Sequence, residues 1–266
     1  MTAAITTSGL TRRFGEVVAV DGLSLEVRPG EVFGLLGPNG AGKTTTIKML
    51  ITLLPPSGGR ATVAGFDVAS EPRQVRRSIG YVPQLLSADG ALTARENLET
   101  TGRLYHLPTA DRRRRTDEAL RFMGLEAAAD RLVRTFSGGM IRRLEIAQAM
   151  LHRPPVLFLD EPTVGLDPIA RRAVWAHVRQ LREEEGTTIL LTTHYMDEAA
   201  ELCQRVGIMH LGHLAALGTP ESLAAEVGPG ASLDDAFTHF TGTELEAEGG
   251  TYRDVARTRR TARRLG

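Results

Sequence analysis

Gly37-Pro38-Asn39-Gly40-Ala41-Gly42-Lys43-Thr44 follows a short apolar segment, residues 31–36, and precedes a helical pattern over about 43–51. The stretch matches G-x-x-x-x-G-K-[ST] in full, in the strand–loop–helix setting that this pattern requires. Glycines let the backbone turn its N–H groups toward phosphate oxygens, and the helix N-terminus adds its dipole. The chain has only two lysines. A lysine at the required place therefore favours a nucleotide site over an ordinary glycine-rich turn.

Each part of this loop has an expected task. Lys43 supplies positive charge to the phosphates, and the Thr44 hydroxyl reaches Mg²⁺. The adjacent Thr45 is assigned to the same site. The loop alone does not decide the function, since GTPases, kinases, motors and transporters all carry it. The Asn-Lys-x-Asp segment usual in guanine-specific GTPases is missing from this chain, which has no third lysine to build one.

Two carboxylates end a second apolar strand pattern, residues 156–159. Asp160 follows a buried strand, where it is placed to hold Mg²⁺ through water. Glu161 points the other way along the strand and is a candidate general base for the attacking water. By themselves these residues fit solvated acids at a strand end equally well. Together with the phosphate loop, they favour a hydrolytic site.

A second candidate anion site begins at Ser137-Gly138-Gly139-Met140, which lies 23 residues before Asp160. Ser137 is a good N-cap for the helical pattern that follows, and two glycines let a phosphate approach the backbone. Alone, this stretch reads as a common serine–glycine turn. Its position before the carboxylates favours the anion site.

The N-terminal part shows short strand patterns. We expect a strand at 17–20, a tight turn at Asp21-Gly22 and a second strand at 23–27. Further strand patterns lie at 61–64 and 79–83, the second ended by a proline.

Strand patterns disappear between about 85 and 151, where helical spacing predicts buried positions at Leu92, Leu98, Leu104, Leu120, Phe122 and Leu125. They return at 156–159 and 188–191, joined by a helix over about 169–184 that Gly186 ends. This βαβ unit implies a parallel sheet, with ligands at the carboxyl ends of its strands.

Composition limits which classes of protein this chain can belong to. The chain has 266 residues, 42% of them hydrophobic, which is enough for a substantial core and excludes full disorder. Thirty-two basic residues balance 32 acidic ones, so no net charge drives binding to nucleic acid. The sequence predicts a cytoplasmic chain for three reasons. It has a single cysteine, it has no apolar run near the ~20 residues of a membrane span, and it shows no signal-peptide pattern.

Each of two arginine-rich stretches has more than one possible interpretation. Arg112-Arg113-Arg114-Arg115 is flanked by acids and reads as a solvated helix face rather than a partner or lipid contact. The end of the chain, from Arg253, belongs to an expected weakly ordered tail over 241–266. That tail suits contact with anionic lipid headgroups and plain solubilisation equally.

In their order and spacing, these motifs resemble those of the ATP-binding cassette (ABC) ATPases, and the resemblance covers nearly the whole chain. Residues 136–140 resemble the family signature, usually L-S-G-G-Q, and depart from it at the first and last positions. Residues 165–167 resemble the D-loop. Met140, at the last position of the signature, is similar to the residue found there in the daunorubicin-type drug-resistance export branch. The remaining matches are Phe14 with the residue that stacks on adenine, Gln84 with the Q-loop, Asp160 and Glu161 with the Walker B pair, Asp167 with the D-loop aspartate and His194 with the switch histidine.

The resemblance implies an α/β P-loop NTPase fold in one domain over 1–240. Its parts are a RecA-like parallel core sheet, an N-terminal antiparallel β region and an inserted helical subdomain at about 85–151. It also implies a head-to-tail dimer with ATP between Lys43 of one chain and Ser137, Gly138 and Gly139 of the other. Glu161 then activates water, His194 stabilises the γ-phosphate, and Mg²⁺ is held through Thr44, Gln84 and Asp160.

For the whole protein, the resemblance implies ATP hydrolysis that powers export through a separate membrane permease. The permease would hold the chain at the cytoplasmic face of the membrane and contact the helical subdomain and the loop after Gln84. One alternative is a soluble ABC ATPase of translation or DNA repair, although those usually carry two cassettes or a long coiled coil. The other is a regulatory nucleotide-binding module without turnover.

Overall fold

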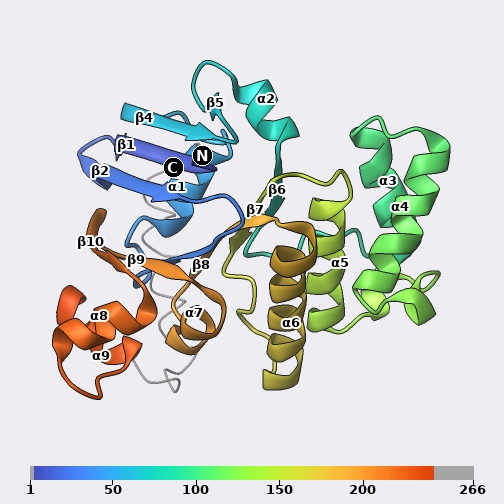
Figure 1. The fold of residues 1–266 in the computed structure, drawn as a ribbon. Helices are drawn as coiled ribbons and strands as arrows, with labels where there is room; N and C mark the ends of the chain where they lie inside the picture. Colours follow the sequence, from blue (N-terminus) through green and yellow to red (C-terminus); the bar gives the residue numbers. More distant parts are fainter. Residues whose placement is uncertain (1–2, 243–266) are drawn as a thin grey trace.

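Two β-sheets enclose one helix in the computed structural model, which describes residues 3–242 (Figure 1). The helix is α1 (Lys43–Leu50), and it contacts strands of both sheets. The antiparallel sheet has the order β2-β1-β4-β5, with β1 Ile5–Phe14, β2 Val17–Val27, β4 Gly58–Val63 and β5 Phe66–Asp67. The larger sheet has the order β10-β9-β3-β8-β7-β6, with β3 Val32–Leu36, β6 Ile79–Val82, β7 Val156–Asp160, β8 Thr188–Thr193, β9 Arg205–His210 and β10 His213–Gly218.

The larger sheet is parallel except at its β9–β10 edge, where the last pair is antiparallel. Helix α6 (Pro168–Glu185) joins β7 to β8 and ends at Gly186, whose φ of 65° is the left-handed C-cap that glycine favours. The expected βαβ unit and the α/β fold class are thereby confirmed. The other helices are α2 Pro72–Arg77, α3 Ala94–Leu104, α4 Thr109–Phe122, α5 Gly138–Met150, α7 Met196–Leu202, α8 Pro220–Val227 and α9 Leu233–Thr241.

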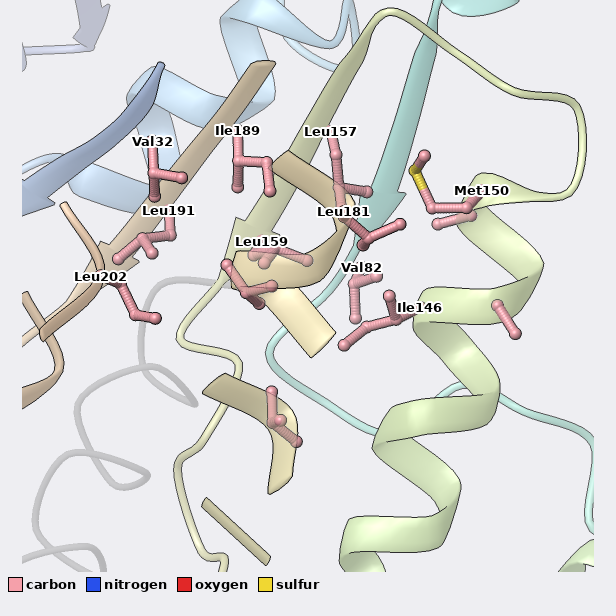
Figure 2. Packing of buried hydrophobic residues seen from close by; sticks show 14 of the residues in the cluster. Val32, Val82, Ile146, Met150, Leu157, Leu159, Leu181, Ile189, Leu191 and Leu202 are labelled. Atoms are coloured by element: carbon pink, nitrogen blue, oxygen red, sulfur yellow. The ribbon is translucent and has the colours of Figure 1, made fainter. Parts of the chain in front are cut away.

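Strand β7 is buried on both faces, which is why its sequence is apolar without alternation. Leu157 and Leu159 face a cluster that includes Ile146 of α5 and Leu181 of α6 (Figure 2). Phe158 faces the opposite cluster, shared with α1 and the antiparallel sheet. The central strands are therefore held between two cores, and the residues that follow them stand on a rigid base.

The stretch expected to be helical contains α3, α4 and α5, with two short 3₁₀ turns at Glu126–Ala128 and Val133–Thr135. Leu98, Leu120 and Leu125 are buried there, as predicted. Leu104 is wrong as a core residue, because it ends α3 and is 74% exposed. Whether this stretch forms a subdomain of one domain over 1–240 stays a prediction.

The expected hairpin at Asp21-Gly22 is wrong. Strand β2 runs through both residues and pairs with β1, which we did not predict, and the chain turns between these strands at residues 15–16. Gly22 has a φ of 63° at an irregularity in the β1–β2 register. A glycine at positive φ occurs both in one type of β-bulge and in the two-residue turns of hairpins, so the same Asp-Gly pair suits either.

The arginine run lies on α4, and three of its four side chains form hydrogen bonds within the chain. Arg114 pairs with Asp111 and Glu118, while Arg115 donates to the Leu151 carbonyl. The tail predicted over 241–266 falls outside the described residues apart from its first two, of which Thr241 ends α9 and Gly242 is the C-cap. Over residues 3–242, none of the helices combines the length and apolar character needed to span a bilayer.

Candidate active site

The register of the parallel strands brings the sequence motifs to one edge of the sheet. Leu36 pairs with Thr193, Asp160 with Thr192, and Val82 with Leu159. The four strands β3, β8, β7 and β6 therefore end at nearly the same level. The phosphate loop, His194, Glu161 and the segment of Gln84 follow these ends, where open parallel sheets bind ligands.

The phosphate loop wraps around the start of α1. Gly42 is the N-cap with a φ of 105°, and a side chain there would place its Cβ 2.5 Å from the Ala19 carbonyl oxygen. No side chain caps the helix and its first turn carries no acid, which leaves the N-terminal amides available to an anion. The Lys43 ammonium donates to the carbonyls of Gly37 at 2.7 Å and Pro38 at 3.2 Å. Burial lowers the pKa of Lys43, while nearby Glu161 opposes that effect.

Asp160 forms the centre of a hydroxyl–carboxylate network. Its Oδ1 accepts hydrogen bonds from the hydroxyls of Thr44 at 3.1 Å and Thr192 at 2.6 Å. Asp160 is 1% exposed, so this oxygen is fixed and points toward the phosphate loop. A threonine hydroxyl beside a carboxylate oxygen is a donor set that suits Mg²⁺, which keeps several waters and few protein ligands.

The buried carboxylate of Glu161 contacts three other predicted site residues. Its Oε1 lies 3.4 Å from Lys43 Nζ and 3.4 Å from His194 Nδ1, and its Oε2 accepts a 2.9 Å hydrogen bond from Gln84 Nε2. Burial opposes the charge, but the contacts with His194 and Lys43 outweigh it, so the pKa of Glu161 lies below its ordinary value. The carboxylate is therefore ionised at neutral pH.

The backbone of Glu161 explains why both acids face the same loop. Glu161 lies just beyond β7 with a φ of 48°, and its N–H bonds to the Thr192 carbonyl and hydroxyl oxygens. The expectation that Glu161 points away from Asp160 along the strand is wrong, because the chain leaves the extended conformation at this residue. A left-handed non-glycine residue costs on the order of 1–3 kcal/mol and is typical of functional sites.

Glu161 and Gln84 line a cleft of about 160 Å³ together with most of the phosphate loop, whereas Asp160 and His194 are not among its lining residues. The polar lining of the cleft and the free amides of α1 fit a nucleoside triphosphate. The Thr44–Asp160 pair fits the metal ion that accompanies such a nucleotide. Within the described chain, no group of three or more His, Cys, Asp or Glu side chains forms a metal cluster of its own. The lining residues are Ala19, Pro38, Asn39, Gly40, Ala41, Gly42, Lys43, Thr44, Thr45, Gln84 and Glu161.

Other predicted residues lie outside this cleft. Phe14 ends β1 and is 45% exposed, with the Arg12 guanidinium 4.6 Å from its ring centroid. Ser137 is exposed and caps α5, where its Oγ accepts from Met140 N at 3.3 Å. Asp167 caps α6 through bonds from the amides of Ile169 and Ala170.

The signature turn and the D-loop segment nevertheless lie together. A Cβ on Gly138 would approach Leu166 at 3.3 Å, and one on Gly139 would lie 2.7 Å from Ala170 Cβ. Gly139 thus permits the start of α6 to pack against α5. The two segments present Ser137 and Asp167 on neighbouring parts of the surface.

Two lining or supporting residues escaped the sequence analysis. Ala19 reaches the cleft from β2, and no motif marks it. Thr192 fixes both Asp160 and the Glu161 amide. Its place two residues before His194 was the available signal.

Comparisons with known proteins identify the family of the chain. The family model described as ABC transporter matches residues 20–164. The chain is 51% identical to the daunorubicin/doxorubicin resistance ATP-binding protein DrrA of Streptomyces peucetius, over 85% of this chain and 68% of that one. It is 42% identical to the linearmycin resistance ATP-binding protein LnrL of Bacillus subtilis (strain 168), over 82% and 70% of the two chains.

A solved structure supports the same assignment. The ATP-binding cassette MJ0796, as a dimer in a post-hydrolysis state bound to ADP and Pi, superimposes with a TM-score of 0.72 at 27% identity. The match covers 81% of this chain and 98% of that one. The phosphate loop, the paired carboxylates and the shared fold lead to one assignment: the chain belongs to the ABC transporter family and is an ATP-binding, ATP-hydrolysing subunit.

Proposed function

We propose that this subunit powers the export of a drug or another hydrophobic compound through a separate membrane permease. The single observation that carries the chemistry is the meeting of Glu161 with Lys43, His194 and Gln84 at one sheet edge. The relatives named as resistance proteins for daunorubicin and linearmycin support the direction and class of transport.

In the proposed reaction, Glu161 accepts the proton of the attacking water. His194 and Lys43 both contact Oε1 of its ionised carboxylate, and Gln84 orients the second oxygen. Lys43 and the α1 amides bind the phosphates, while Thr44, Asp160 and Gln84 would hold Mg²⁺. A bound ion would supply positive charge to the phosphates.

The proposal includes a head-to-tail homodimer. Ser137 stands on the surface, outside the cleft that Lys43 lines in the same chain. A second copy would place its Ser137, Gly138 and Gly139 over this cleft, with Asp167 nearby. The dimeric state of MJ0796 supports this arrangement.

Phe14 is proposed as the surface on which adenine stacks. Phe14→Ala should weaken ATP binding about 5- to 150-fold and reduce discrimination between ATP and GTP, because stacking on a base is worth about 1–3 kcal/mol. Calorimetric titration with both nucleotides measures this. Val17, which pairs with Phe14 and is 65% exposed, offers Val17→Ala as the matched control. Unchanged affinity in Phe14→Ala would remove Phe14 from the site.

We propose that the permease docks in a groove of about 330 Å³ between the sheet and the helices α3 and α5. Leu53 and Tyr105 line it with exposed fractions of 60% and 37%. Leu85 and Leu86, which are 81% and 49% exposed, immediately precede its lining residue Ser87. An apolar cytoplasmic segment of the permease suits this surface, since large exposed apolar patches mark interaction sites.

Daunorubicin serves as the probe for the export test. A strain lacking the gene should accumulate the drug, and wild-type protein should restore efflux. The double variant Leu85→Ser/Leu86→Ser should fail to restore it while keeping the ATPase rate of the isolated protein. Leu217→Ser, at an exposed leucine of β10, is the matched control. Full efflux by the double variant would exclude this groove, and unchanged accumulation in the deleted strain would exclude this drug class.

A further inference from the structure

Two buried side chains of α5 hold the loop that carries Gln84. Arg142 is 1% exposed, and its guanidinium donates to the Pro83 carbonyl at 2.6 Å and to the Gln84 carbonyl at 2.8 Å. Both acceptors belong to consecutive residues just after β6. A planar guanidinium fork suits two adjacent carbonyls, whereas a lysine ammonium acts as a point charge.

Glu145 holds the other end of the same loop. Its Oε1 accepts hydrogen bonds from the amides of Ser87 and Ala88 and from the Ser87 hydroxyl. Its Oε2 lies 3.0 Å from Arg142 Nη1, and both side chains are 2% exposed. The loop from Pro83 to Ala88 is thus attached at both ends to one turn of one helix.

This attachment connects three places with different tasks. Gln84, on the loop, donates to Glu161 in the cleft. Ser87 and Glu145 line the groove proposed for the permease. Ser137 caps the same helix α5, which packs against β6, with Ile146 next to Val82 (Figure 2).

A purely structural ion pair is a poor explanation for this arrangement. Buried ion pairs contribute little net stability compared with well-packed apolar side chains, because desolvation offsets their attraction. Here the charged groups also satisfy four backbone groups of a single loop. These bonds fix the loop to α5, which apolar side chains that only filled the core would not do.

We propose that Arg142 and Glu145 are positioning residues that hold Gln84 at Glu161 and make residues 83–88 move with α5 as one body. The inference rests on the proposed roles of Gln84 and Glu161. Neither Arg142 nor Glu145 lines the nucleotide cleft.

A double-mutant cycle on the full chain tests the route through Gln84. Arg142→Lys and Glu145→Gln should each lower kcat about tenfold, a typical loss for residues that orient catalytic groups. The Kd of a fluorescent ATP analogue should stay within about twofold, since the phosphate loop is untouched. In a Gln84→Ala background, neither substitution should lower kcat further, because the group they position is already absent.

Arg143→Lys is the matched control, since the neighbouring Arg143 donates to the Met123 carbonyl at 2.7 Å and not to this loop. Its kcat should be unchanged. Additive losses, near a hundredfold in the double variants, would overturn the proposal, as would a Kd that rises in step with the fall in kcat. If Gln84→Ala alone keeps the wild-type kcat while Glu161→Gln is inactive, the positioning role is wrong and the ATPase function stands.

Hydrogen exchange in nucleotide-free protein gives a readout independent of turnover. The amides of Ser87 and Ala88 should exchange at least about tenfold faster in Glu145→Gln and Arg142→Lys, while those of α1 keep their rates. Thermal unfolding shows whether each variant is folded. Unchanged exchange in a folded variant would show that the pair does not hold the loop.

Discussion

Glu161→Gln is expected to lower kcat by roughly 10²–10⁴-fold, the usual loss when a positioned general base is removed. The amide keeps the size of the side chain but cannot take a proton from water at neutral pH. ATP binding should survive, because Lys43, Thr44 and the loop amides are unchanged. Single-turnover hydrolysis and a nucleotide titration separate the two effects. Glu183→Gln, at an exposed acid on α6, is the matched control.

The same variant should also reveal the dimer. If hydrolysis normally separates two cassettes, ATP should hold Glu161→Gln chains together, with or without Mg²⁺, whereas ADP should not. Size-exclusion chromatography with light scattering measures this shift. A wild-type hydrolysis rate would disprove Glu161 as the base. Lost turnover without an ATP-dependent dimer would leave the base intact and point to a dimer that needs the permease or a different cassette.

Ser137→Arg is expected to abolish ATPase activity while each monomer still binds ATP. The long side chain would occupy the position proposed for the neighbour's γ-phosphate. The lost N-cap of α5 costs about 1 kcal/mol, which thermal unfolding should show as a modest change. Ala110→Arg, at an exposed position of α4, tests whether an added arginine alone is harmful.

Mixing two inactive variants tests whether the sites are shared. In a heterodimer of Ser137→Arg with Lys43→Ala, both lesions fall on one site and the other site is intact. Activity should therefore return to at most one site per dimer. Full activity of Ser137→Arg alone would contradict the shared site.

The local motifs were predictable because their physical requirements are local. A phosphate loop needs its glycines, Lys43 and Thr44 in consecutive positions, so the order of residues already contains the site. The β7–α6–β8 unit was equally clear, since two apolar strands and a helix ended by Gly186 have few other arrangements. In contrast, β9, β10 and the helices after His194 were not predicted, because their patterns are short and depend on the strands beside them.

Leu104 and the Asp21-Gly22 pair show where local reasoning failed. Helical spacing cannot tell that α3 ends at Leu104, whose side chain is exposed, and positive φ at Gly22 serves a bulge as well as a turn. Arg142 and Glu145 read as ordinary polar positions of a helix. Only the approach of β6 to α5 makes them partners of the Gln84 loop.

The sequence by itself determined that this protein binds a nucleoside triphosphate, through residues adjacent in the chain whose chemistry needs no distant partner. The tertiary structure alone decided that Glu161 turns toward Lys43, that Thr192 supports Asp160, and that Ser137 lies outside the cleft of its own chain. The physical reason is register. Strand pairing sets which residues end at one edge of the sheet, and some of the paired residues, such as Leu36 and Thr193, lie more than a hundred residues apart in the sequence.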